Sequence, residues 1–136
     1  MLILASASKA RLELLKSVGI SPDKIISTDI NEKPKKDEKN LDYVLRIALE
    51  KNKAVKKNSS EIVLSADTIV SVGRRILLKP NNIDEASSFL SLLSGRRHRV
   101  HTSICIFYNH KFYQKNITTI LKMKRLSDEE KKSYLK

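Results

Sequence analysis

Apolar runs alternate along the chain with segments in which apolar residues recur at helical spacing. Short apolar runs typical of buried strands begin at Leu2 and Ile62, whereas the segments after Ser8 and Asn40 repeat every three or four residues. The pattern predicts strands over 2–5, 24–28, 61–65, 76–78, 98–107 and 111–123, and helices over 9–18, 41–57 and 83–93. Alternating elements of this kind indicate an α/β domain, with a mixed, twisted sheet flanked by helices.

Residues that start and stop helices and turns agree with these boundaries. Ser8 is suited to an N-cap and Gly19 to a C-cap. The segment 29–39 is a polar loop that contains Pro34, and a hairpin is expected around residues 73–75. Ser127 and Glu130 form a capping box for a helix of about two turns, after which the sequence stops. The predicted apolar face of helix 41–57 consists of Leu41, Val44, Leu45, Ala48, Ala54 and Val55.

Length and charge narrow the class of protein. The 136 residues fit a single domain, 1–136, with a real core. The net charge of +12 raises the hypothesis of nucleic-acid binding, but the lysines over 33–57 are interleaved with acidic residues and no aromatic stacking platform is visible. We therefore do not expect a nucleic-acid partner. We expect Cys105, the one cysteine, to be a buried structural thiol in "SICIFY".

The sequence also bears on the compartment. No stretch approaches the roughly 20 apolar residues that a membrane-spanning helix needs. The N-terminus lacks the basic leader and cleavage site of a secretion signal. A cytoplasmic protein without membrane contact is expected.

The stretch "LILASASKARLELL" runs from an apolar strand through two serines into a basic helix. Such a junction leaves backbone N–H groups unpaired, and these attract anions. Ser6, Ser8, Lys9 and Arg11 therefore indicate a phosphate or carboxylate cradle, although a plain capped turn has the same composition. The absence of a Gly-x-Gly pattern excludes a dinucleotide fingerprint and a P-loop.

Four other charged residues are candidates for chemistry. Asp67 is expected at the exit of the buried strand, where a carboxylate can hold a metal or act as a base. Lys79 precedes Pro80, which fixes the backbone next to it. Glu32 and Lys51 would ordinarily be surface charges. Carboxylates for a hard divalent cation and cations for phosphates are together the equipment of a metal-assisted phosphoanhydride hydrolase.

The segment "SGRRHRVHTS" is rich in basic residues. Strand alternation would place Arg97, Arg99 and His101 on one face and His98 on the other. We do not expect a zinc site there, because the two histidines point apart and no cysteine joins them.

The segments "LILASASKARLELL", "SADTIV", "LLKP" and "SGRRHRVHTS", in this order, resemble the Maf family of nucleoside triphosphate pyrophosphatases over essentially the whole chain. The resemblance implies two lobes around a cleft, as in the inosine triphosphate pyrophosphatases. It implies hydrolysis between the α- and β-phosphates of a nucleoside triphosphate, with Mg²⁺ or Mn²⁺ as cofactor, and a link to septum formation. It also suggests a homodimer.

The resemblance assigns roles by position. Ser6, Ser8 and Arg11 match the phosphate-binding turn, and Asp67 matches the acidic residue that is a metal ligand or the base. The pair Asp67-Thr68 resembles the dTTP/UTP branch, which makes Thr68 a substrate contact. The remaining matches are Glu32, a catalytic residue and second metal ligand, and the catalytic lysines Lys51 and Lys79.

The chain departs from the family pattern in two places. Lys9 and Ala10 replace the proline and first arginine of the usual Ser-Pro-Arg-Arg turn. The sequence also ends before the family's Ala-Gly-x-Tyr-x-Ile-Gln-Gly segment, as a C-terminally truncated member would. Besides an active pyrophosphatase, the alternative is therefore a catalytically impaired remnant that binds nucleotide phosphates or a partner without turnover.

Overall fold

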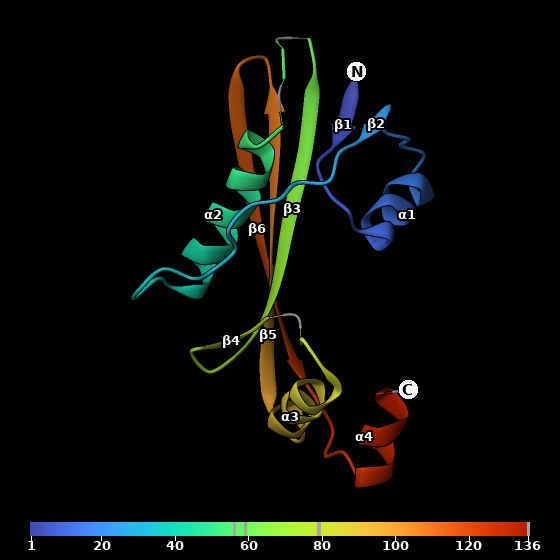
Figure 1. The fold of residues 1–136 in the computed structure, drawn as a ribbon, viewed down its shortest axis with the longest axis vertical. Coiled ribbons are helices and arrows are strands. Elements are labelled where there is room, and N and C mark those ends of the chain that lie inside the picture. The colour runs from blue at the N-terminus through green and yellow to red at the C-terminus, as the bar shows by residue number, and fades with distance from the viewer. Residues whose placement is uncertain (56, 59, 79, 136) are drawn as a thin grey trace. The chain divides into compact units, whose positions relative to one another are not determined.

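The computed structural model describes residues 1–55, 57, 58, 60–78 and 80–135 (Figure 1). The predicted order of strands and helices is confirmed. The elements are β1 (Leu2–Leu4), α1 (Lys9–Ser17), β2 (Lys24–Ile25), α2 (Asn40–Lys53), β3 (Ile62–Val72), β4 (Arg75–Leu77), α3 (Ile83–Leu93), β5 (Arg97–Tyr108), β6 (Lys111–Lys122) and α4 (Asp128–Tyr134). Within the described part of the chain, no helix is long and apolar enough to cross a membrane.

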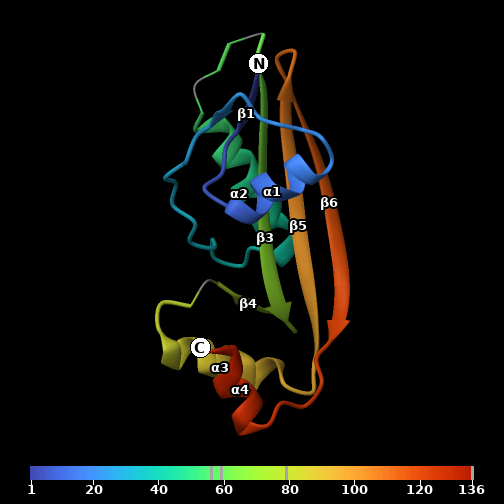
Figure 2. The same ribbon diagram turned by 90° about the vertical axis from the view of Figure 1, so that its right-hand side faces the viewer.

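The strands form one mixed sheet in the order β2-β1-β3-β5-β6, with β4 paired to β3. β1 runs parallel to β2 and β3, whereas β4 runs antiparallel to β3. β5 and β6 are joined by a tight turn (Figure 2). Both turn residues, Asn109 and His110, have positive φ (51° and 66°). This conformation matches the right-handed twist of hairpin strands and is tolerated best by short polar residues.

The chain divides into two compact units. Unit 1 comprises Met1–Asp67 and Thr102–Asn116, and unit 2 comprises Thr68–His101 and Ile117–Lys136. Each unit has its own helices, so the expected two-lobed α/β arrangement has a counterpart in these units.

The core of unit 1 lies where β1, β3 and β5 meet the segment that follows α2. Its cluster consists of Ile3, Ala5, Val55, Val63 and Phe107. One buried hydroxyl in this core is paired across elements. The buried Ser65 hydroxyl donates to the carbonyl of Ala48 (2.7 Å), which ties β3 to α2. Cys105 is buried as predicted, and burial raises the pKa of its thiol.

The predicted extent and apolar face of α2 are wrong in detail. The helix ends at Lys53 rather than at 57. The residues that it buries are Tyr43, Val44, Ile47, Ala48 and Asn52, whereas Leu41 is 43% exposed. Tyr43 and Asn52 belong to the buried face although they are polar, because a buried phenol or amide is stable where it finds a hydrogen-bond partner. The amide of Asn52 donates to the carbonyls of Val63 (2.9 Å) and Cys105 (3.1 Å), on β3 and β5.

The expectation that Asp67 lies at the exit of a strand is also wrong. β3 runs unbroken from Ile62 to Val72, so Asp67 lies in its middle. The strand continues because its last residues pair with β4, Val70 opposite Leu77 and Val72 opposite Arg75. Asp67 is 8% exposed and shares the buried side of the strand with Ser65.

In unit 2, the segment after β6 is fixed to the end of α3. The N–H of Leu126 donates to the Ser94 hydroxyl (2.6 Å), and Leu126 itself is 6% exposed. α4 contacts α3, and its predicted capping box between Ser127 and Glu130 is confirmed. Docking therefore stabilises a helix that is too short to be stable alone.

Candidate active site

The turn between β1 and α1 is held by its own serines. Ser8 is the N-cap of α1, and its side chain accepts from the N–H of Arg11 (3.3 Å). The Ser6 hydroxyl accepts from the N–H of Ser8 (3.1 Å) and from Nη1 of Arg11 (3.3 Å). The Arg11 guanidinium is thus folded back over the start of the helix, where free N–H groups and the helix dipole favour an anion. We call Ser6, Ser8 and Arg11 the serine turn.

Two carboxylates meet one ammonium group elsewhere in unit 1. Nζ of Lys51, on α2, lies 3.2 Å from Oδ1 of Asp67 and 3.2 Å from Oε1 of Glu32. The side chains of Lys51 and Asp67 are 16% and 11% exposed, whereas that of Glu32 is 53% exposed. We call these three residues the acid–lysine cluster. It brings together residues that are far apart in the sequence.

The electrostatics of Asp67 join the cluster to the serine turn. Burial raises the pKa of Asp67 above its usual value, and the nearby negative charge of Glu32 raises it further. The positive charges of Lys51 and Arg11 act in the opposite direction without cancelling the effect of burial. Of the serine turn, it is thus Arg11 whose charge acts on the cluster, by lowering the pKa of Asp67.

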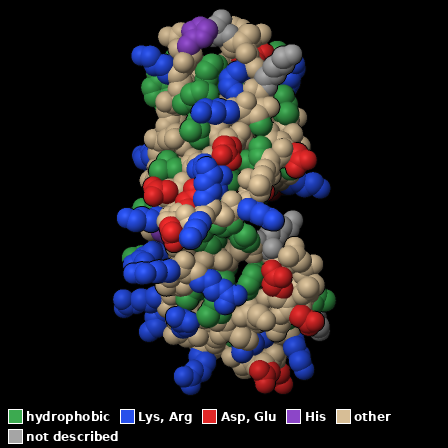
Figure 3. Space-filling model, turned by 60° about the vertical axis from the view of Figure 1, so that its left-hand side comes forward, with side chains coloured by type: hydrophobic (Ala, Val, Ile, Leu, Met, Phe, Trp, Pro, Cys, Tyr) green, Lys and Arg blue, Asp and Glu red, His purple; other side chains and the backbone are tan. Residues whose placement is uncertain are grey.

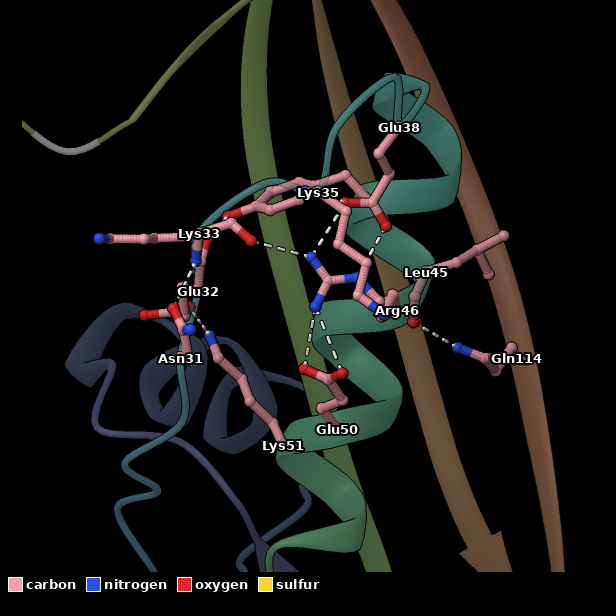
Figure 4. Close-up of polar contacts among 11 residues, drawn as sticks. Asn31, Glu32, Lys33, Lys35, Glu38, Leu45, Arg46, Glu50, Lys51 and Gln114 are labelled. Atoms are coloured by element: carbon pink, nitrogen blue, oxygen red, sulfur yellow. Dashed lines mark hydrogen bonds and ion pairs between the residues drawn. The ribbon is translucent and has the colours of Figure 1, made fainter.

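The loop that carries Glu32 is fastened to α2 (Figure 4). The Tyr43 hydroxyl donates to the backbone carbonyl of Glu32 (2.6 Å). One turn further along the helix, Nη2 of Arg46 donates to the carbonyl of Lys33 (3.1 Å). Burial and the nearby charges of Asp67 and Glu32 raise the pKa of Tyr43 to about 12, so that it remains a neutral donor.

Arg46 also forms a two-pronged ion pair with Glu38 at the end of this loop. Its Nε lies 2.7 Å from Oε2 and its Nη2 2.9 Å from Oε1 of Glu38. Nη1 contacts Glu50 (3.1 Å), and the N–H of Lys35 donates to Glu38 (3.0 Å). The hydrogen bond from Arg46 lowers the pKa of Glu38 to about 2. Through its contacts with Lys33 and Glu38, Arg46 fixes both ends of the segment from Glu32 to Glu38. We call the ion pair between Arg46 and Glu38 the clamp.

The roles of Tyr43 and Arg46 were not found from the sequence. The spacing of Arg46 and Glu50 is that of a helical ion pair, which is the one available signal. Their contacts with the loop depend on how 29–39 folds back, which the local pattern does not show.

One predicted site residue, Thr68, is placed differently, and another is not described. Thr68 is exposed and follows Asp67 directly in β3, so strand alternation directs its side chain away from the face of Asp67. Lys79 lies outside the described residues. Their assigned roles stay predictions.

The donor set of the cluster suits a divalent cation. Asp67 and Glu32 present carboxylate oxygens to one point, where the Lys51 ammonium now provides the positive charge. Among the described residues, no group of three or more His, Cys, Asp or Glu side chains could hold a metal ion. Mg²⁺ is commonly bound by one or two carboxylates together with substrate phosphates, so two carboxylates fit this ion.

Positive charge is not confined to these residues. On the face drawn in Figure 3, Lys and Arg side chains are spread widely, with Asp and Glu side chains among them. The face drawn in that figure therefore shows no purely basic surface.

Solved structures with a similar fold have little sequence in common with the chain. One is a HAM1 protein from Coxiella burnetii, with a TM-score of 0.54 and 14% identity over 88% of this chain and 70% of that one. Another is a dITP/XTP pyrophosphatase from Mycobacterium abscessus, with a TM-score of 0.50 and 14% identity over 98% and 92% of the two chains. At this identity the comparison shows the fold alone, and it confirms the expected fold class.

Relatives at much higher identity have names that describe an activity. A dTTP/UTP pyrophosphatase of Ruegeria sp. (strain TM1040) is 49% identical over 133 residues, which are 98% of this chain and 69% of that protein. A dTTP/UTP pyrophosphatase of Wolbachia pipientis wMel is 47% identical, with the same shares of each chain. A nucleoside triphosphate pyrophosphatase of Ehrlichia canis (strain Jake) is 46% identical over 98% of this chain and 71% of that protein.

The chain thus spans about 70% of the length of these relatives. The family model described as Maf-like protein matches all of residues 1–136. The chain belongs to the Maf-like protein family.

Proposed function

We propose that the chain is a nucleoside triphosphate pyrophosphatase, which hydrolyses the bond between the α- and β-phosphates to give a monophosphate and pyrophosphate. The observation that carries this proposal is the convergence of Glu32 and Asp67 on Lys51, within reach of the charge of Arg11. The names of the relatives, dTTP/UTP pyrophosphatases among them, support a pyrimidine nucleoside triphosphate as substrate.

The serine turn is suited to bind the triphosphate. The N-terminus of α1 and the guanidinium of Arg11 offer partial and full positive charge to phosphate oxygens. Ser6 holds the guanidinium in place before substrate arrives, which reduces the entropy lost on binding. Lys79 is proposed as a further cation for the leaving pyrophosphate, and Thr68 as a substrate contact.

Asp67 is suited to accept a proton from the attacking water. Its raised pKa makes it a stronger base than an exposed aspartate, while Lys51 at 3.2 Å stabilises the carboxylate form. The same carboxylate, together with Glu32, could instead hold Mg²⁺ or Mn²⁺, and we leave both roles open. Such an ion would neutralise the charge that develops on the phosphate oxygens. Tyr43 and Arg46 keep Glu32 in position by fixing its loop.

The test is pyrophosphate release from dTTP and UTP with added Mg²⁺ or Mn²⁺. We expect turnover by the wild type and a loss of about two orders of magnitude or more in Asp67→Asn, as is usual when a base is removed. Asp84→Asn, which changes an exposed carboxylate in the first turn of α3, is the matched control and should leave turnover unchanged.

Absence of turnover by the wild type, or full turnover by Asp67→Asn, would refute the proposal. Calorimetric titration with a non-hydrolysable triphosphate separates the alternatives. Tight binding without turnover would instead support a module that binds nucleotide phosphates through the serine turn.

A further inference from the structure

Unit 2 contains a cavity that the proposed function does not use. It has a volume of about 210 Å³ and is lined by Ser71, Gly73, Arg97, His98, Arg99 and Ile120. All six residues belong to unit 2, and none is a member of the serine turn or of the acid–lysine cluster. Three of them come from "SGRRHRVHTS", the basic segment for which the family resemblance provides no role. We call this cavity the arginine pocket.

His98, which lines the pocket, has a buried ring nitrogen without a hydrogen-bond partner among the described residues. His98 is 9% exposed, and its Nδ1 makes no hydrogen bond with any part of the chain that the structure describes. Buried polar atoms are nearly always hydrogen-bonded, because an unpaired one loses its hydration without compensation. With its proton on Nδ1, the imidazole has a hydrogen bond left to donate, and a small shift of the ring would offer it to an oxygen atom of a ligand in the pocket.

A second polar group of the pocket is held in a fixed position. The Ser71 hydroxyl, 1% exposed, lies 3.3 Å from Nε2 of His101. Nδ1 of His101 lies in turn 2.9 Å from the Thr118 hydroxyl of β6. Burial and the charge of Arg99 lower the pKa of His101, which keeps its ring neutral and both nitrogens engaged with hydroxyl groups. His101 is thus a positioning residue for Ser71.

Burial in this segment does not follow the predicted alternation. Arg97 and Arg99 are exposed, whereas His101 is buried like His98. Neighbouring strands decide this, since Ser71 on β3 and Thr118 on β6 supply the partners that let His101 be buried.

Charge and size restrict the ligand. Among the described residues, two arginines line the pocket and no carboxylate does, and the guanidinium group is the side chain best matched to oxyanions. The volume of about 210 Å³ is below the roughly 300–1,000 Å³ of pockets that enclose drug-sized ligands, so the pocket suits a small ligand such as a single tetrahedral oxyanion.

We propose that the arginine pocket is a binding site for a phosphate-type oxyanion, with Arg97 and Arg99 supplying charge and His98 and Ser71 supplying fixed polar contacts. The site does not depend on the proposed function, because it shares no residue with it. Its ligand is a free phosphate or the terminal phosphate of a small molecule.

The test follows the side-chain nitrogens of ¹⁵N-histidine-labelled protein during titration with inorganic phosphate. The chain has three histidines, His98, His101 and His110. We expect a saturable shift of the His98 signals, while those of His110, in the exposed turn between β5 and β6, stay in place. The latter serves as an internal control for ionic strength and pH.

Variants then identify the groups responsible. Arg97→Gln/Arg99→Gln should raise the Kd for phosphate about tenfold or more, because it removes two charge-assisted donors. Arg96→Gln is the matched control, since Arg96 is exposed and adjacent but does not line the pocket. Asp67→Asn should leave the His98 response unchanged, which separates this site from the acid–lysine cluster. Circular dichroism verifies that each variant is folded.

The proposal fails if His98 does not respond at phosphate concentrations far above a millimolar Kd. It also fails if the double arginine variant responds as the wild type does. A shift with short duplex DNA but not with phosphate would refute it too, because the pocket would then belong to a nucleic-acid-binding surface.

Discussion

The ion pair between Arg46 and Glu38 allows the most quantitative test, because its coupling energy can be measured. The substitutions Glu38→Gln and Arg46→Met, made singly and together, form a double-mutant cycle that measures the coupling energy between the two side chains. The pair has two short contacts, 2.7 Å and 2.9 Å, and its side chains are 17% and 9% exposed for Arg46 and Glu38. It is therefore more than an ordinary surface ion pair.

The shift in pKa sets the upper limit of the coupling. The pKa of Glu38 falls from 4.5 to about 2 in the folded protein, which corresponds to roughly 3 kcal/mol of stability at neutral pH. Solvent reaches the pair in part, so we expect a coupling energy of about 1–2 kcal/mol. The neighbouring pair of Arg46 and Glu50 is more exposed and should couple by about 0.5 kcal/mol or less, which makes Glu50→Gln the matched control.

The sign of the pH dependence follows from the direction of the shift. Because the folded protein holds Glu38 ionised at a lower pH than the unfolded chain does, its contribution is complete above pH 4.5 and is lost as the pH falls toward 2. Urea unfolding at pH 7 and pH 3 measures this, and the coupling should fall by about half or more at pH 3. A coupling below 0.5 kcal/mol at pH 7, or one that is independent of pH, would refute the reasoning.

Three further changes test the site and its scaffold. Asp67→Asn should raise the free energy of unfolding at pH 7, because burial raises the pKa of Asp67 and so disfavours its ionised form in the folded protein. The gain in stability should vanish when the pH falls below 3.8, the pKa of this group in the unfolded chain. Tyr43→Phe should cost about 1 kcal/mol in urea unfolding and lower kcat/KM, since the bond that holds the Glu32 carbonyl is lost. Gly19→Ala should lower stability by about 1 kcal/mol, because φ is +82° there although a Cβ would meet open space.

Each of these has an outcome that contradicts it. A lower stability of Asp67→Asn at pH 7 would mean that the pairing with Lys51 outweighs burial. Unchanged kcat/KM in Tyr43→Phe would show that Glu32 needs no fixed loop. Equal stability of Gly19→Ala and the wild type would mean that the backbone relaxes at residue 19. The control for this substitution is Ser17→Ala, in the exposed last turn of α1.

Features that depend on neighbouring residues in the sequence were predictable. The N-cap at Ser8, the capping box at Ser127 and the turn at Gly19, one residue after the C-cap Val18, all rest on contacts within a few residues. The N–H groups of Gly19 and Ile20 bond back to the carbonyls of Lys16 and Leu15 at 3.0 Å and 2.9 Å, as the glycine predicts. The order of helices and strands follows from the same local periodicity.

The candidate site could be named from the sequence but not assembled from it. The residue types and their order along the chain single out Glu32, Lys51 and Asp67, because carboxylates and amines carry their chemistry wherever they lie. That one ammonium would bridge both carboxylates depends on the loop before α2 folding back over that helix. Tyr43 and Arg46 hold the loop there, and neither had a local pattern that indicated it.

The sequence by itself thus determined the order of the elements, the caps at Ser8 and Ser127 and the family, since each is set by local geometry or by the motifs themselves. Only the tertiary structure decided that β3 continues past Asp67, that Asn52 joins two strands from within the core, and that His98 borders a cavity with an unpaired nitrogen. Burial and strand pairing depend on partners that are distant in sequence. Their free energy is gained only when the whole sheet forms, and no window of neighbouring residues contains it.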